Sequence, residues 1–461
     1  MKKITLVLSL FLFSLSSGTY AQDTVRVSLQ EFIDRGFENA GQLKFERQKV
    51  HLAENQVAQV NAKRYLPQFN MSSQHGLVPG VTSNTDLSEN EYYLDPNLEN
   101  DWENWAVFTR AEVNAIQPLF TWGALRNAVK AAESAAVAAR EQFEQQQADL
   151  KVRLAELYQS HLLTKEIMRL LDEATGTISD IESQLEERKE EGAENFDESD
   201  FFKFQIFKSE FATRATEVQE SAAMTRRIWD YVMQAEEGTV YMPETRFLDP
   251  VSEALKEISF YRMNAITNRS EVQAIDAGIE AAEYGLEAQK GEALPALILG
   301  LQASFAHTPN RARQSNPYII NNSNYLSASF GFVIRQNLDF YNINAKIEQR
   351  ELQHRQAKYL KEAAVDGIVL EINEIYKNTS LSKAKVENTD EALVTSKKWL
   401  RQEQLDYDFG IGDTKDLIDA MQKELQLRVQ MKRDIFQLNK NMIQLYRKSG
   451  LPITQIFNDE E

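Results

Sequence analysis

The sequence predicts a protein that combines long α-helical hairpins with transmembrane β-hairpins. Three observations support this fold class. The runs 123–191 and 341–407 contain no proline and consist mainly of helix-forming residues, four shorter segments alternate apolar and polar side chains, and the order of these elements occurs twice in the chain of 461 residues. Buried helix faces repeat every three or four residues and strand faces every two, so the two patterns separate the two kinds of element.

Residues 1–21 have the pattern of a secretory signal peptide. A pair of lysines precedes an apolar run from Ile4 to about Leu15, and Ala21 supplies the small residue that suits signal peptidase. A membrane anchor is the alternative, but the apolar run is short for a span of about 20 residues. We therefore expect an exported protein.

The composition argues against several classes of function. A formal net charge of −18 is unsuited to nucleic acid, because phosphate binding needs clustered Lys and Arg. The absence of cysteine rules out disulfides, thiolate metal sites and a cysteine nucleophile. The 5 histidines are scattered, and no phosphate loop, nucleophile elbow or zinc-binding helix motif occurs. We expect no enzyme activity, no catalytic or cofactor-binding residues, no cofactor, no metal site and no nucleic-acid partner.

The two long runs have the periodicity of helices with one buried face. In the run 123–191 the apolar face includes Tyr158, and Gly176 is the one glycine in the interior of the run. At 1.5 Å per residue each run would form a rod of roughly 100 Å. Such a rod does not fit inside a compact domain.

Shorter helices accompany the long ones. They are expected at residues 28–39, 42–65, 198–233, 268–291 and 414–449. Ser28 is the expected N-cap of the first helix, because its hydroxyl can accept a hydrogen bond from the first turn. Gly450 followed by Pro452 should end the last helix.

Four segments have the period of strands, near residues 68–76, 104–116, 297–307 and 325–335. Each is about ten residues long and has one continuous apolar face, as a tilted strand needs to cross a bilayer. The alternative is a pair of soluble hairpins packed on a helix bundle. The polar segments 80–103 and 308–323 suit loops on the outer side of a membrane barrel.

The order helix, proline, strand, polar loop, strand, long helix, glycine-containing break and helix occurs twice. Matching positions lie about 220 residues apart, namely Pro67 and Pro295, Gln117 and Gln336, and Gly192 and Gly410. The sequence thus predicts a signal peptide at 1–21, a first repeat at 22–237, a linker or equatorial segment at 238–265 and a second repeat at 266–461.

Four strands are too few to close a barrel. An open sheet edge in lipid leaves backbone donors and acceptors unpaired at several kcal/mol each, so other copies of the chain must complete the sheet. Three copies would supply twelve strands, which is within the range of known barrels. The strand pattern requires an oligomer but does not by itself fix the number at three.

Three motifs give the chain a resemblance to a known family. They are LPQF at 66–69, QPLFTWGALRNAV at 117–129 and YDFGIGDTKDLIDAMQ at 407–422. Together with the duplicated plan, they make nearly all of the mature chain similar to the TolC family of outer-membrane efflux proteins.

The resemblance implies a homotrimer in which a 12-stranded β-barrel in the outer membrane continues as an α-helical tunnel through the periplasm of a Gram-negative type envelope. Such a protein is the passive exit duct of a tripartite efflux pump or a type I secretion system. Its partners would be a periplasmic adaptor (membrane fusion protein), an inner-membrane transporter and outer-membrane lipid. The alternative is a soluble periplasmic coiled-coil adaptor or scaffold, which would wash off in salt or carbonate, whereas the channel would need detergent.

The resemblance also assigns residues to the periplasmic end of the tunnel. Gly192, Gly410 and Gly412 fall at the two helix-turn tips, where a left-handed backbone conformation would cost glycine little. Asp416 and Asp419 match the aspartates that ring the entrance constriction. A narrow ring of carboxylates would attract cations and repel anions. Without the resemblance, both acids would simply be exposed residues that suit the start of a helix.

Tyr407 and Asp200 match a latch that holds neighbouring helices shut in this family. An ordinary packing role is the alternative for the tyrosine. Two features of this chain depart from the family pattern. The segment GAENFDESDFF before and around Asp200 carries two extra residues, and Gly412 stands where the best-known members have a gating arginine. The latch of this protein is therefore expected to differ.

Overall fold

The computed structural model describes residues 23–82, 99–191, 198–236, 238–311, 322–409 and 411–457. The expected signal peptide at 1–21 lies outside these residues. The chain divides into two compact units. Unit 1 contains the chain up to Leu43, residues 147–265 and the chain from Leu370 onward, and unit 2 contains residues 44–146 and 266–369.

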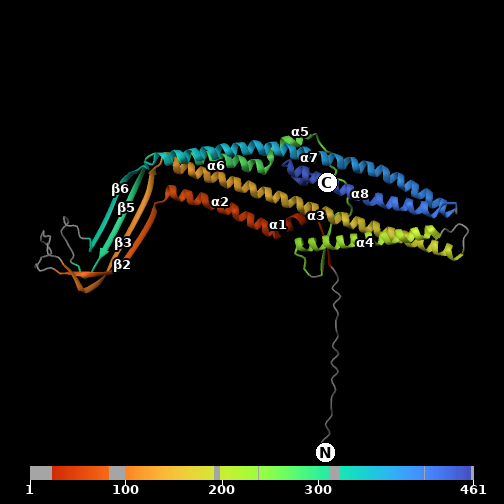
Figure 1. Ribbon diagram of the computed structural model, residues 1–461, viewed down its shortest axis with the longest axis horizontal. Helices are drawn as coiled ribbons and strands as arrows, with labels where there is room; N and C mark the ends of the chain where they lie inside the picture. Colours follow the sequence, from red (N-terminus) through yellow and green to blue (C-terminus); the bar gives the residue numbers. More distant parts are fainter. Residues whose placement is uncertain are drawn as a thin grey trace, which may run out of the picture. The chain divides into compact units, whose positions relative to one another are not determined.

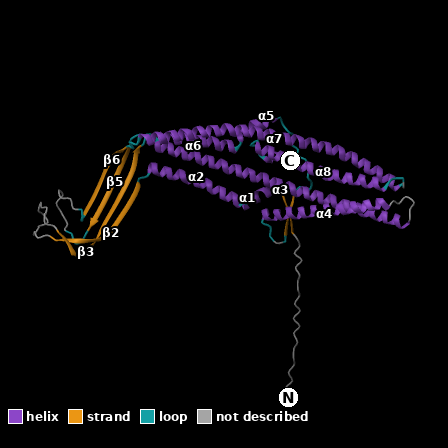
Figure 2. Cartoon of the chain, viewed as in Figure 1, coloured by secondary structure: helices purple, strands orange, loops and turns teal. Residues whose placement is uncertain are grey.

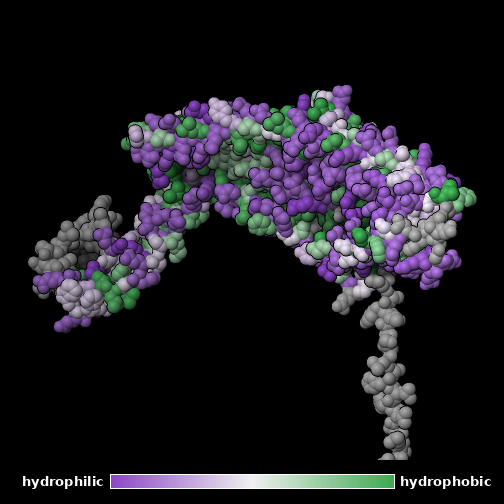
Figure 3. Space-filling view, turned by 45° about the vertical axis from the view of Figure 1, so that its right-hand side comes forward, coloured by the Kyte–Doolittle hydropathy of each residue, from purple (hydrophilic) through white to green (hydrophobic). Residues whose placement is uncertain are grey.

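Most of the described chain is helical (Figure 1). The helices are α1 (Leu29–Asn39), α2 (Gly41–Tyr65), α3 (Ala124–Glu191), α4 (Glu198–Met233), α5 (Ile258–Asn268), α6 (Ser270–Glu292), α7 (Phe340–Asp408) and α8 (Thr414–Lys448), followed by a short 3-10 helix at Ile453–Ile456. No described helix has an apolar stretch of the length needed to pass through a bilayer. Hydrophilic residues dominate the helical surface that faces the viewer in Figure 3.

Unit 2 contains an antiparallel four-stranded sheet (Figure 2). Its strands are β2 (Gln68–Thr82), β3 (Glu99–Phe120), β5 (Ala296–His307) and β6 (Tyr325–Arg335), in the order β2-β3-β5-β6. The pairing of β3 with β5 joins the two halves of the chain. Within the described chain, β2 and β6 each pair on one side only. The sheet therefore has two open edges.

The first two strands are longer than the alternation predicts. The apolar and polar pattern breaks near Pro79, where a bulge shifts the register between Pro79 and Gly80, yet the ladder continues to Thr82 paired with Glu99. Parts of the expected loop 80–103 are therefore strand. Backbone pairing continues past the bulge because the ladder does not require the side-chain pattern.

One face of the sheet is apolar and exposed in the single chain. On β6 the exposed fractions of Leu326, Phe330, Phe332 and Ile334 are 82%, 79%, 70% and 75%. The opposite face is polar, and the Glu112 carboxylate accepts hydrogen bonds there from Asn114 at 2.7 Å and from Gln302 at 2.9 Å. An apolar face of this extent is unfavourable in water and suited to lipid.

Unit 1 contains a second, small sheet that the sequence pattern does not predict. β1 (Asp23–Val27) pairs in parallel with β4 (Thr239–Pro243), which lies in the segment expected to be a linker. The Tyr158 hydroxyl donates to the carbonyl of Val27 at 3.1 Å and so ties α3 to β1. The linker segment also forms most of α5, so part of it belongs to the folded core of unit 1.

Helix ends follow the expected local chemistry. Ser28 forms a capping box with Glu31 at the start of α1, which confirms its assignment as N-cap. The backbone of Gly450 has a φ of 68°, a left-handed conformation that glycine adopts without strain, just beyond the end of α8. Local signals therefore determine these ends.

The motif QPLFTWGALRNAV forms the turn from β3 into α3. Trp122 and Gly123 both have positive φ values, 52° and 83°. The Trp122 indole donates to the carbonyl of Pro295 at 2.8 Å, which helps to hold a conformation that is unusual for a bulky residue. Next to this turn, α6 packs so closely on α3 that a Cβ at Gly291 would lie 2.8 Å from the backbone nitrogen of Ala124.

We predict that Gly291→Ala destabilises the protein. The added methyl would force backbone apart, and overpacking of this kind costs about 1–3 kcal/mol. Gly278→Ala in the same helix is the matched control, because a Cβ there meets nothing within 4 Å. Replacing an unhindered helical glycine should stabilise by about 0.5–1 kcal/mol. Urea unfolding in detergent, followed by circular dichroism, measures both changes, and equal midpoints for the two variants would contradict the close contact.

Candidate functional site at the hairpin tips

The two helix-to-helix turns of unit 1 bring the expected site residues to one region. α3 ends at Glu191 and α4 begins at Glu198, while α7 ends at Asp408 and α8 begins at Thr414. We call the described residues beside these turns, 185–191, 198–207, 405–409 and 411–421, the tip. Gly192 and Gly410 lie outside the described residues.

Gly412 is required for a different reason from the one expected. Its φ is not in the left-handed region, so the left-handed explanation is wrong at this position. A Cβ at Gly412 would instead lie 2.7 Å from the backbone nitrogen of Tyr407. The backbone N–H groups of Ile411 and Gly412 donate to the carbonyl of Asp406 at 3.0 and 2.8 Å and end α7 tightly. An arginine at position 412 would not fit without moving the last turn of α7.

Tyr407 is 1% exposed and belongs to an apolar cluster built by α3, α4, α7 and α8. Other buried members of this cluster are Leu185, Phe204 and Leu417. The hydroxyl lies near Thr414 but makes no hydrogen bond of good geometry with any described residue, and burial raises its pKa. Tyr407 is therefore not hydrogen-bonded to Asp200, the partner expected from the resemblance.

Arg188 contacts Tyr407 instead. The guanidinium carbon lies 4.0 Å from the centre of the tyrosine ring, and Nη2 donates to the Tyr407 carbonyl at 3.3 Å. Sequence reasoning did not single out Arg188, because the charged faces of long helices usually meet only water.

Asp200 is 6% exposed in the first turn of α4. Burial acts to raise its pKa, but hydrogen bonds with Lys203 and Asp413 outweigh burial, and the pKa is lowered. The Lys203 ammonium lies 2.9 Å from the carboxylate. Asp200 is therefore held in the ionised form and bridges α4 to the start of α8.

Asp413 is the N-cap of α8, and its carboxylate accepts the backbone N–H of Lys415 at 3.0 Å. This bond acts to lower the pKa of Asp413. The hydrogen bond with Asp200, burial, and the negative charges of Asp200 and Asp416 act in the other direction and prevail, so the pKa is raised. Of the two carboxyl groups, Asp413 is therefore the one that binds a proton first as the pH falls. Neither Asp413 nor its pairing with Asp200 was singled out from the sequence.

Asp416 and Asp419 lie near the start of α8 and are both exposed. Residues between and beside them, Leu417, Ile418 and Ala420, are buried in the tip. The two aspartates are three positions apart and so lie on one side of the helix, away from the core of their own chain. They are free to face a space shared with other copies.

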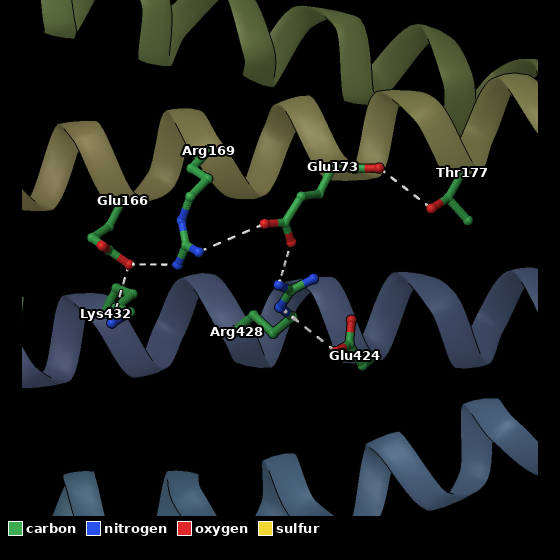
Figure 4. Close-up of polar contacts among 7 residues, drawn as sticks. All are labelled: Glu166, Arg169, Glu173, Thr177, Glu424, Arg428 and Lys432. Carbon is green, nitrogen blue, oxygen red and sulfur yellow. Dashed lines mark hydrogen bonds and ion pairs between the residues drawn. The ribbon is translucent and has the colours of Figure 1, made fainter. Parts of the chain in front are cut away.

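A series of ion pairs connects α3 to α8 away from the turns (Figure 4). We call its members, Glu166, Arg169, Glu173, Glu424, Arg428 and Lys432, the polar ladder. Glu166 is 3.0 Å from Arg169 and 3.2 Å from Lys432, Glu173 is 3.8 Å from Arg169 and 2.6 Å from Arg428, and Arg428 is 3.7 Å from Glu424.

The ladder contains one buried carboxylate. Glu166 is 2% exposed and lies beside two cations, Arg169 on its own helix and Lys432 on α8. The hydrogen bond from Arg428 lowers the pKa of Glu173, whereas burial raises the pKa of Glu424. The polar ladder therefore joins the α3–α4 hairpin to the α7–α8 hairpin. Glu166 and Glu173 on α3 each pair with one cation on α8, Lys432 and Arg428 respectively.

Duplicated helical hairpins joined to an antiparallel sheet with an exposed apolar face define a class of outer-membrane channel. This chain belongs to the outer membrane efflux protein family, whose family model matches residues 32–198 and 262–451. It is an efflux channel of the outer membrane that extends into the periplasm. Channels of this family form trimers and function with pump partners.

Solved structures of outer-membrane channels have the same fold. CusC has a TM-score of 0.74 and 15% identity, with 93% of this chain and 93% of that chain covered. The open state of Neisseria gonorrhoeae MtrE has a TM-score of 0.72 and 14% identity, with 92% of this chain and 89% of that chain covered. Campylobacter jejuni CmeC has a TM-score of 0.70 and 14% identity, with 94% of this chain and 87% of that chain covered. A search of curated protein sequences finds no match.

We predict that acidification favours the conformation seen here. The groups facing the pair of Asp200 and Asp413 are Lys203 on α4 and Lys415 and Asp416 on α8. The pKa of Asp413 is raised above 3.8, so protonation of Asp413 stabilises its pairing with Asp200 as the pH falls toward the raised pKa. This stabilisation is lost as the pH rises through the raised pKa. Conductance in planar bilayers should therefore change as the pH is lowered from neutral toward the raised pKa of Asp413.

Asp413→Asn tests this assignment without removing the helix cap, because asparagine caps as well as aspartate does. Its conductance should not share this change with pH. Asp408→Asn is the control, since Asp408 is exposed at the end of α7 and, among the described residues, accepts a bond from Gln404 one turn away. This control should titrate like the unmodified protein, and an unchanged profile in Asp413→Asn would remove the carboxyl pair as the cause.

Proposed function

We propose that three copies of this chain assemble into a 12-stranded barrel and a helical tunnel, forming the passive exit duct of a tripartite efflux pump or a type I secretion system. The partners would be a periplasmic adaptor, an inner-membrane transporter and outer-membrane lipid. Transport through the duct needs no catalytic step, and the energy comes from the pump. The observation that carries the proposal is the sheet of unit 2, which has two open edges and an exposed apolar face.

The open edges favour an oligomer over a single chain in the membrane. In lipid no water is present to pair with the free backbone groups of β2 and β6, and each unpaired group costs several kcal/mol. Pairing β6 of one copy with β2 of the next satisfies both edges. The soluble adaptor or scaffold is not favoured, because it would expose the apolar side chains of β6 to water.

We predict that the two faces of β6 tolerate charge very differently. Phe330→Arg places a cation on the apolar face, where it should cost about 2–4 kcal/mol near the middle of a bilayer. Ser329→Arg places the same side chain on the opposite face, where a barrel has water, and should be nearly neutral. The yield of detergent-extracted, heat-sensitive oligomer on gels measures the difference. Equal yields, or a protein that washes off in carbonate, would support the soluble alternative.

We also propose that Asp416 and Asp419 from three copies line the entrance of the tunnel. Both are exposed in the single chain and follow directly on the turn between α7 and α8. Six carboxylates around one axis would favour cations over anions in the narrow part of the path. Tyr407, Asp200 and Gly412 would serve the same entrance by setting the position of the tip.

The double variant Asp416→Ala with Asp419→Ala should lose several-fold in the permeability of cations relative to anions. The matched control is Glu217→Ala with Glu220→Ala, which removes two exposed acids of the same spacing from the middle of α4. Reversal potentials in planar bilayers under a salt gradient measure both. If the two double variants retain the same selectivity, the aspartates do not line the entrance.

A further inference from the structure

Arg188 contacts the tip in a way that the resemblance does not assign. It lies near the end of α3, one turn beyond Leu185, which is 2% exposed in the apolar cluster. Its guanidinium stands over the ring of Tyr407 and donates to the carbonyl of the same residue, with distances of 4.0 Å to the ring centre and 3.3 Å to the oxygen. One side chain thus holds both the face and the backbone of Tyr407.

The carbonyl that Arg188 binds lacks the usual helical partner. In a continuous helix the N–H of residue 411 would donate to the carbonyl of residue 407, but here the N–H of Ile411 donates to Asp406. The last carbonyls of a helix need outside donors, and a cation near the C-terminus is also favoured by the helix dipole. The last turn of α7 has no basic residue. Arg188, from another helix, supplies both the donor and the charge.

The ring contact adds a second interaction that depends on burial. Tyr407 is 1% exposed, so a cation on its ring face interacts through a medium with little water, where such contacts are strongest. A planar guanidinium can stack on the ring and donate to the carbonyl at once, whereas an ammonium acts as a point charge. The tyrosine hydroxyl, which makes no hydrogen bond of good geometry with the described residues, takes no part in this contact.

The contact joins two different hairpins. Arg188 belongs to the α3–α4 hairpin, and Tyr407 lies in the last turn of α7, directly before the turn that leads to Asp416 and Asp419. If the two aspartates line the entrance, the α7–α8 tip must move relative to α3 when the entrance changes width. That movement would break the ring contact and the hydrogen bond together.

We propose that Arg188 latches the α7–α8 tip to α3 through its contacts with the ring and the carbonyl of Tyr407. It is a positioning residue that holds the α7–α8 tip against α3 and so sets the width of the entrance. The inference rests on the proposed function, in which the tip forms the entrance of the tunnel.

The test compares Arg188→Gln with Lys189→Gln in planar bilayers, using the full-length purified oligomer. Lys189 is the matched control because its ammonium lies 4.6 Å from the ring of Phe201, a cation–π contact within the α3–α4 hairpin. Arg188→Gln should raise the ratio of open to closed channels by about tenfold, as expected for loss of a partly desolvated cation–π contact. Lys189→Gln should leave the ratio unchanged.

Variants of Tyr407 separate a latch from a general loss of stability. Tyr407→Phe keeps the ring and the carbonyl, so it should behave like the unmodified protein. Tyr407→Leu should open the channel like Arg188→Gln, and the double variant should open it no further than either single variant. Arg188→Lys should restore only part of the closed population. Retention of the heat-sensitive oligomer shows that each variant is assembled.

Equal open-to-closed ratios in Arg188→Gln and Lys189→Gln would overturn the latch, as would additive effects in the double variant. These outcomes are distinct from failure of the proposed entrance, which is measured by the ion selectivity of the Asp416 and Asp419 variants. A channel that opens on loss of Arg188 but keeps its selectivity when both aspartates are removed would retain the latch and reject the carboxylate ring.

Discussion

The structure depends on one constraint, which is the pairing of backbone hydrogen-bonding groups in a medium without water. The sheet of unit 2 ends in the unpaired edges of β2 and β6, and its apolar face is exposed along β6. The apolar face is suited to lipid, but the unpaired edges are unfavourable there in a single copy of the chain. The proposed oligomer would complete the sheet by pairing these edges between copies.

Much of the fold follows from local patterns. α4 has the expected bounds, Glu198–Met233, because its helix-forming run is bounded by a glycine-containing break and a polar segment. β5 and β6 match the alternating segments closely, since a strand that separates lipid from water must alternate at every position. The N-cap at Ser28 was predictable because a cap acts through residues that are neighbours in the sequence.

Features made by distant residues were not predictable. β1 and β4 have five residues each, too few for a periodic signal, and they pair across more than 200 positions of the chain. The carboxyl pair of Asp200 and Asp413 and the contact of Arg188 with Tyr407 depend on the packing of two hairpins. Gly412 was recognised as a turn residue, but glycine is needed there because the backbone of Tyr407 leaves no room for a Cβ. The conformational preference of glycine alone does not reveal such a contact.

The polar ladder has a consequence for how the helices can move. α3 runs toward the turns and α8 runs away from them, so Glu166 lies opposite Lys432 while Glu173 lies opposite Arg428. Sliding one helix along the other by a turn would separate Lys432 from Glu166 and Arg428 from Glu173, so that Arg169, on the same helix, would be the cation left beside the buried Glu166. Piston-like displacement of α8 is therefore unfavourable. Swinging about the ladder as a hinge keeps every charge paired and leaves the tips to travel furthest.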